Sequence, residues 1–158
     1  MIPNITPNPS KIEGKRRKYK LAYLVLIQEL HGFHQIKKFL EIVDDSQAVF
    51  LLHVPKTDDS VYALLDEYIK TDGPRDQNGQ SNVFLSTYRY GKTTGHIDIV
   101  YSQLSGFWEL LDMADWDYVI NLSNYDWPLR HNQQIHSILQ KHPGHSYIEF
   151  NTETSELF

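Results

Sequence analysis

Cysteine is absent from the 158 residues of this sequence. Disulfide frameworks, cysteine-based zinc sites and thiol nucleophiles are therefore excluded. The sequence also lacks the run of about 18 apolar residues that a membrane span requires. Its longest apolar runs, Leu21–Ile27 and Val49–Leu52, have the length of strands, and the polar residues 1–10 hold no apolar leader segment. We therefore expect neither a membrane span nor a secretory leader within these residues.

Positive charge is scarce as well. The 15 Lys and Arg residues are outnumbered by 20 Asp and Glu residues, which gives a net charge of −5 with histidine neutral. Because binding to a phosphate backbone needs clustered basic side chains, we expect no nucleic-acid partner. The phosphate-binding patterns G-x-G-x-x-G and G-x-x-x-x-G-K-[ST] are both missing, which disfavours dinucleotide-binding proteins and P-loop enzymes. The missing G-x-S-x-G pattern disfavours an α/β-hydrolase.

From Leu21 onward, apolar runs of strand length alternate with segments of helical periodicity. Strands are predicted at 21–27, 49–54, 82–86, 117–123 and 145–150, and helices at 34–43, 60–69, 97–113 and 132–140. This alternation predicts an α/β fold with a doubly wound, mainly parallel sheet of about five strands and helices on both faces. Residues 21–158 are predicted to form this domain. Residues 1–20, which end in the basic run GKRRKYK, are predicted to be a solvated tail, with a nuclear-import or membrane-surface role as the alternative.

Open parallel sheets bind ligands beyond the carboxyl ends of their strands. In this sequence the rule selects Gln28 and Glu29, His53–Lys56, Thr87–Arg89, Asn124–Arg130 and Glu149–Asn151. Asp126, past the end of the strand at 117–123, is better placed than Asp115 and Asp117, which lie at the start of that strand. His53 could contact a ligand or be a buried histidine with its hydrogen bonds satisfied. Trp127 could stack on a sugar or base, or pack against its own turn.

Other residues that could suggest chemistry are predicted to be structural. Phe107 and Trp108 lie on the helical segment 97–113 and are predicted to be core. Asp115-Trp116-Asp117 precedes its strand, so it belongs at the opposite edge of the sheet and is predicted to be a surface helix end. The pairs His31/His34 and His142/His145 have no evident further ligands, so we predict no metal site.

The most specific pattern lies at 116–130, where WDYVINLS is followed directly by NYDWPLR. It resembles the signature W-x-[FY]-x-I-N-L-[SC]-x-x-D-[FYW]-P-[LI]-[RK] of the core-2/I-branching N-acetylglucosaminyltransferases and the protein xylosyltransferases. Four shorter segments are similar to that family in the same order: 21–23, 49–54, 82–84 and 110–113. The resemblance covers about residues 20 to 150.

This resemblance implies a GT-A-like fold and the transfer, with inversion, of N-acetylglucosamine or xylose from a UDP-sugar to a hydroxyl of a glycan or glycoprotein. It implies no metal or other cofactor, and a location on the lumenal side of the Golgi membrane. Carried over position by position, the donor contacts are Ile27, Gln28, Glu29, Pro55, Lys56, Asp58, Gly95 and His96. The residues at the substrate edge are Asn124, Asp126, Trp127 and Arg130.

The sequence departs from the family pattern at three features. Pro55 stands where the family has an aspartate, Gly95-His96 replaces Trp-Gly, and the family's cysteines are missing. Family members continue for well over another hundred residues, and that part supplies the base for the acceptor hydroxyl and the charge that neutralises the leaving UDP. We therefore expect the general base beyond Phe158 and assign no catalytic residue. Two alternatives remain: a truncated, non-catalytic α/β module that binds nucleotide or a protein partner, and an unrelated flavodoxin-like domain.

Overall fold

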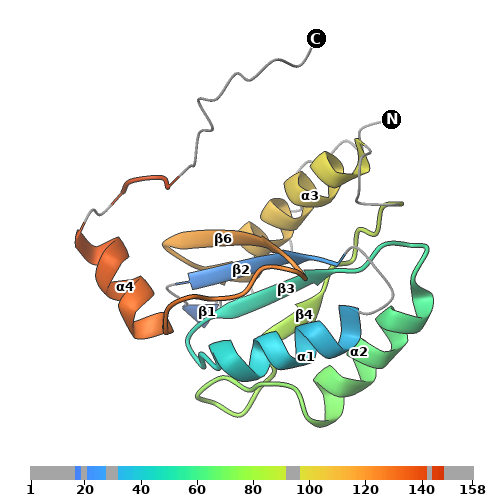
Figure 1. The fold of residues 1–158 in the computed structure, drawn as a ribbon, viewed down its shortest axis with the longest axis horizontal. Coiled ribbons are helices and arrows are strands. Elements are labelled where there is room, and N and C mark those ends of the chain that lie inside the picture. The colour runs from blue at the N-terminus through green and yellow to red at the C-terminus, as the bar shows by residue number, and fades with distance from the viewer. Residues whose placement is uncertain (1–16, 19–20, 28–31, 92–96, 142–143, 148–158) are drawn as a thin grey trace. The chain divides into compact units, whose positions relative to one another are not determined.

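The computed structural model describes residues 17–18, 21–27, 32–91, 97–141 and 144–147 (Figure 1). Its elements in chain order are β1 Arg17–Lys18, β2 Leu21–Leu26, α1 Gly32–Val43, β3 Val49–His53, α2 Asp59–Thr71, β4 Val83–Leu85, α3 Asp98–Met113, β5 Ala114–Asp115, β6 Tyr118–Ser123 and α4 Asn132–Lys141. The chain divides after Trp127 into two compact units. The second unit contains α4, which buries none of its residues.

Four strands form one parallel sheet in the order β4-β3-β2-β6. β2 lies in the middle and buries all six of its residues, which explains its unbroken apolar sequence LAYLVL. The chain adds β3 and then β4 on one side of β2, and it later places β6 on the other side of β2. The sheet therefore has a topological switch point between β2 and β6, which is where ligands bind in such folds. The predicted α/β fold, GT-A-like in character, is confirmed.

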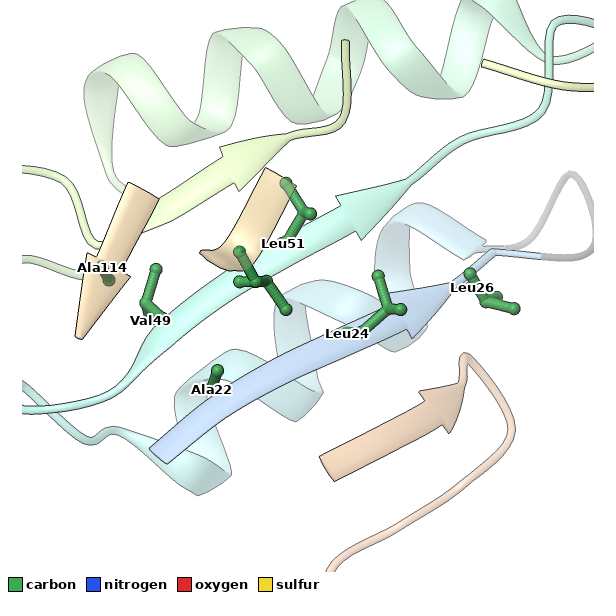
Figure 2. Close-up of a cluster of buried hydrophobic side chains, with 7 residues drawn as sticks. Ala22, Leu24, Leu26, Val49, Leu51 and Ala114 are labelled. Carbon is green, nitrogen blue, oxygen red and sulfur yellow. The ribbon is translucent and has the colours of Figure 1, made fainter. Parts of the chain in front are cut away.

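Helices cover both faces of this sheet, as predicted. On one face the ring of Tyr23 stacks on that of Phe50 with centroids 4.9 Å apart, and Phe39 of α1 meets Tyr23 edge-on at 6.1 Å. α1 and α2 lie on this side of the sheet, whereas α3 lies on the other (Figure 1). Figure 2 shows the cluster under α3, which consists of Ala22, Leu24, Leu26, Val49, Leu51, Leu110 and Ala114.

α3 reaches the sheet through small side chains. A Cβ atom on Gly106 would lie 2.5 Å from Cδ1 of Leu24, so the absence of a side chain lets the helix approach β2 closely. Ser102 is fully buried and its hydroxyl donates to the carbonyl of Asp98. The prediction that Trp108 is core is wrong, because 41% of its surface is exposed, while Phe107 is partly buried and packs against the cluster.

Two further differences from the sequence prediction lie at the ends of the chain. Arg17–Lys18, inside the predicted solvated tail, forms a two-residue parallel pair with Ala114–Asp115. The strand predicted at 145–150 is not seen in His145–Tyr147, and the rest of that range lies outside the described residues. In the part of the chain that the structure describes, no helix has the length and apolar character to cross a membrane.

Candidate functional site

The carboxyl ends of three strands are level at the switch point. In the sheet register Leu26 lies opposite His53 on one side and opposite Ser123 on the other. The residues that follow continue the pairing: the Ile27 N–H donates to the carbonyl of His53 at 2.9 Å, and the Asn124 N–H donates to the carbonyl of Leu26 at 3.1 Å. The prediction that the residues after these strands meet at one edge is therefore confirmed.

His53 ends β3 and is completely buried. Its Nε2 accepts a hydrogen bond from the Tyr90 N–H at 3.3 Å, and the two rings stack with centroids 6.2 Å apart. Burial lowers the pKa of His53 from 6.5 to about 4, and the positive charge of Arg89 also lowers it. The imidazole is therefore neutral with its proton on Nδ1, which has no partner among the described residues. The contact with Tyr90 holds the ring, but the unbonded Nδ1 differs from the predicted histidine with satisfied hydrogen bonds. The predicted ligand contact of His53 stays a prediction.

The segment after β3 is a tight turn. The carbonyl oxygen of Pro55 accepts the Asp58 N–H at 3.1 Å, and the Lys56 N–H donates to the carbonyl of Tyr90 at 2.8 Å. Pro55 is buried, so this position offers neither a carboxylate nor an open side chain. Asp58 occupies the N-cap position of α2 without a side-chain capping bond, and the Lys56 side chain is exposed. Lys56 and Asp58 are thus the charged groups that this turn contributes.

Arg89 joins the loop after β4 to the turn after β3. Its Nε donates to the Val54 carbonyl at 3.0 Å and its Nη2 to the Pro55 carbonyl at 2.7 Å. Its Nη1 lies 2.8 Å from Oδ1 of Asp59, and the guanidinium carbon lies 4.4 Å from the ring centroid of Tyr62. The planar guanidinium can make these contacts in several directions at once, so it fixes both segments relative to α2.

Glu109 of α3 holds the start of the same loop. One carboxylate oxygen accepts the Thr87 N–H at 2.7 Å, and the other accepts the hydroxyl of the buried Ser86. The rule for parallel sheets placed Thr87–Arg89 at the edge, but no sequence pattern gave a role to Arg89 or singled out Glu109. The contacts join residues that are 22 to 35 positions apart in the chain, so no local pattern reveals them.

Removing the charge of Glu109 is expected to loosen this loop. In Glu109→Gln the amide oxygen can still accept one of the two hydrogen bonds that Ser86 and Thr87 donate, but without the negative charge that strengthens them. We therefore expect the free energy of unfolding to fall by about 1 kcal/mol. Chemical denaturation measures this change. Asp112→Asn, on the exposed side of α3, serves as the control and should change stability by less than about 0.5 kcal/mol. Equal effects of the two substitutions would contradict this role of Glu109.

After β6 the chain turns at Asn124 and Asp126. Asn124 is buried, and its side-chain amide donates to the Gln35 side chain of α1. Oδ2 of Asp126 accepts both the Ser123 N–H at 2.6 Å and the Ser123 hydroxyl at 2.9 Å. The carboxylate of Asp126 therefore closes this turn.

Two aromatic or charged residues follow this turn. Trp127 is 41% exposed, and Nζ of Lys38 lies 5.9 Å from its ring centroid. The ring is thus partly exposed with the Lys38 ammonium over it, and both predicted roles of Trp127 stay predictions. Arg130 is exposed and belongs to the second unit.

A family model described as "Branch: Core-2/I-Branching enzyme" matches residues 21–156. This chain belongs to the Core-2/I-Branching enzyme family. Its curated relatives include xylosyltransferase 2 of Homo sapiens, which is 25% identical over 143 residues that cover 88% of this chain and 15% of the relative. A xylosyltransferase of Ciona intestinalis is 22% identical over 155 residues, with 96% and 17% covered. Xylosyltransferase 1 of Mus musculus is 23% identical over 134 residues, with 82% and 13% covered.

The family name and the names of these relatives are those of glycosyltransferases, and the resemblance predicted from the signature at 116–130 is confirmed. The chain spans 13% to 17% of the length of these relatives. Of the eight predicted donor contacts, the structure describes Ile27, Pro55, Lys56 and Asp58. The other four, namely Gln28, Glu29, Gly95 and His96, lie outside the described residues.

Asp115-Trp116-Asp117 lies at the amino end of β6, as predicted, because Asp117 directly precedes this strand. The prediction that it is a surface helix end is wrong, because α3 ends at Met113 and Asp115 belongs to β5, where it pairs with Lys18. Both carboxylates thus lie at the amino end of β6, away from the switch point. His31 and His142 lie outside the described residues. Among the residues that are described, no three His, Asp or Glu side chains gather in a way that could hold a metal ion.

Proposed function

We propose that this chain is the donor-binding part of an inverting glycosyltransferase, which transfers xylose or N-acetylglucosamine from a UDP-sugar to an acceptor hydroxyl. One observation carries the proposal. In a chain of the Core-2/I-Branching family, the carboxyl ends of β2, β3 and β6 are level at the switch point of a parallel sheet. Nucleotide ligands bind open α/β sheets at this position.

Two charged side chains suit this donor. Lys56 is exposed beside the β3 turn, and its ammonium group can neutralise part of the charge of a diphosphate. Asp58 can accept hydrogen bonds from ribose hydroxyls, which replaces the carboxylate that Pro55 lacks. His53, bonded to the Tyr90 N–H, and Arg89, bonded to the Pro55 carbonyl, hold the neighbouring loop against this turn.

Inverting transfer also needs a base for the acceptor hydroxyl and charge to stabilise the leaving UDP. Asp126 is poorly suited to act as this base, because its carboxylate already accepts two hydrogen bonds from Ser123. We therefore assign the base to no described residue and expect it in another part of the protein. The acceptor is a glycan or glycoprotein, the reaction proceeds without a metal ion, and the protein acts at the lumenal side of the Golgi membrane. The family resemblance supports these three proposals.

Calorimetric titration of the chain with UDP, UDP-xylose and UDP-N-acetylglucosamine tests donor binding. We expect all three to bind. A ligand concentration of about 100 times Kd should then raise the free energy of unfolding by about 2.7 kcal/mol. Lys56→Ala should weaken UDP binding about tenfold, because one favourable charge on the diphosphate is lost. Lys70→Ala, which removes a lysine on α2 that pairs with Asp66, is the matched control and should leave UDP binding unchanged. Absent binding, or equal binding of UDP and ADP, would contradict the proposal.

A second function is favoured by the turn at Pro55. Proline has no side-chain carboxylate for a nucleotide, and the carbonyl oxygen of Pro55 already accepts hydrogen bonds from Asp58 and Arg89. A non-catalytic module that binds a nucleotide or a protein partner would tolerate this loss. Incubating the natural full-length protein with radiolabelled UDP-sugars distinguishes the two functions. Transferred or hydrolysed sugar supports the enzyme, whereas UDP binding without either product supports the module.

A further inference from the structure

α3 turns a row of large apolar side chains away from the sheet. We call this the apolar row; its members are Ile97, at the helix N-cap, and Val100, Leu104, Trp108 and Leu111. Each of the five is exposed over 41% to 62% of its surface. A surface helix ordinarily buries its large apolar residues and exposes polar ones. α3 buries Leu110 in this way and packs Phe107 partly against the core, but its other fully buried residues are small, namely Ser102, Ser105 and Gly106.

The row is narrow, continuous and free of charge. At 100° per residue its five members fall within about 80° around the helix axis, and they extend over about 21 Å. Glu109 points to the other side, where it binds Ser86 and Thr87. Asp112 is exposed and flanks one end of the row. A continuous apolar patch of this kind on a protein surface ordinarily marks an interaction site.

We propose that the apolar row packs against the same row of a second copy of this chain, with the two α3 helices antiparallel. The members follow one another at intervals of 3, 4, 4 and 3 residues, so the spacing reads the same in both directions. A two-fold axis at Leu104 then places each Ile97 opposite the other copy's Leu111, and each Val100 opposite the other copy's Trp108. A two-fold interface requires this reciprocity, in which the same patch serves both partners.

Charge favours the antiparallel arrangement over a parallel one. With the axis at Leu104, the two copies of Asp112 are separated by about 24 Å along the helices. This distance exceeds the screening length of about 8 Å at physiological ionic strength, so their repulsion is negligible. A parallel pair in the same register would bring the two carboxylates side by side. The antiparallel arrangement also sets the two helix dipoles in opposite directions, which is favourable.

The area of the row is sufficient for a specific contact. At roughly 100 Å² for each half-exposed side chain, two facing rows bury about 1,000 Å², which is the lower size of specific interfaces. We therefore expect a weak dimer, with a dissociation constant on the order of micromolar.

Cross-linking tests the geometry directly, because the chain has no cysteine of its own. In Leu104→Cys the new thiol lies beside the two-fold axis, so a short bis-maleimide should join two copies. Leu64→Cys on α2, at a leucine of similar exposure, is the matched control and should stay monomeric. Ile97→Cys and Leu111→Cys should cross-link when they are mixed, but neither should cross-link alone. Linkage of Ile97→Cys to itself would overturn the antiparallel register.

Sedimentation equilibrium tests the association itself. The unaltered chain should have twice its mass of 18.5 kDa at high concentration. Leu104→Glu should be monomeric and retain its circular dichroism spectrum, while Leu64→Glu should still dimerise. A monomeric unaltered chain would overturn the proposal, as would a dimer that survives Leu104→Glu. Two further results would also overturn the proposal if the chain is monomeric. Protection of the Leu104→Cys thiol from alkylation would mean that another part of the chain covers the apolar row. Sedimentation of the chain with lipid vesicles would mean that the row binds a membrane.

Discussion

The free energy of unfolding should fall by about 3 kcal/mol as the pH drops from 6.5 to 4, through His53 alone. Burial lowers the pKa of this histidine in the folded chain to about 4, whereas in the unfolded chain it is 6.5. Between these values the unfolded state binds a proton that the folded state does not bind. Acid therefore favours unfolding in this window, and the effect levels off below about pH 4. Urea denaturation at a series of pH values measures it.

His53→Gln isolates this contribution. The Gln side chain is neutral throughout the window and keeps an acceptor for the Tyr90 N–H that His53 Nε2 now binds. The substituted chain should lose the part of the pH dependence that lies between pH 6.5 and 4. His34→Gln, at an exposed position of α1, should keep it. Identical pH profiles for the original chain and His53→Gln would show that His53 is protonated without cost in the fold.

Arg89→Ala is expected to lower the free energy of unfolding by about 3 kcal/mol. The substitution removes the Arg89 donor to the Val54 carbonyl and one of the two donors to the Pro55 carbonyl, which keeps the Asp58 N–H. It also removes the pairing with Asp59. Arg89→Lys should recover only part of this loss, because an ammonium group cannot reproduce the planar set of contacts over Tyr62. Chemical denaturation of the three proteins measures the series.

Arg75→Ala is the matched control for this substitution. The Arg75 side chain donates one hydrogen bond, to the Lys70 carbonyl at 2.8 Å, in an exposed setting. Its removal should cost less than about 1 kcal/mol. If Arg89→Ala were as mild as Arg75→Ala, the loop after β4 would be held by its other contacts, and Arg89 would not position the candidate site.

The sheet was predictable because strands that are buried on both faces consist of continuous apolar residues. β2 and β3 are unbroken apolar runs, and the segments between strands have the length and periodicity of helices. The switch point follows from strand order, which the sequence does not state. The rule for parallel sheets still selected the edge at which the carboxyl ends of β2, β3 and β6 meet. The signature at 116–130 supplied the family.

The orientation of α3 was not predictable from periodicity. Apolar residues occupy more than half of its circumference, so the pattern does not show which side meets the sheet. The fit of Gly106 against Leu24 decides the orientation, and this contact joins residues that are far apart in the sequence. The contacts of Arg89 and Glu109 were not predictable either, because they also join residues that are far apart in the sequence. The short pairing of β1 with β5 involves only two residues on each side, too few to leave a pattern.

The most direct test of the proposed donor site is a titration of the ¹⁵N-labelled chain with UDP, followed by backbone amide shifts. The largest changes should occur at the carboxyl edge, at Ile27, Lys56, Asp58 and Tyr90. The amides of Ala22, at the amino end of β2, and of Asp115, in β5, should not move. Changes concentrated at that amino end, or no changes at millimolar UDP, would contradict the assignment of this edge as the nucleotide-sugar site.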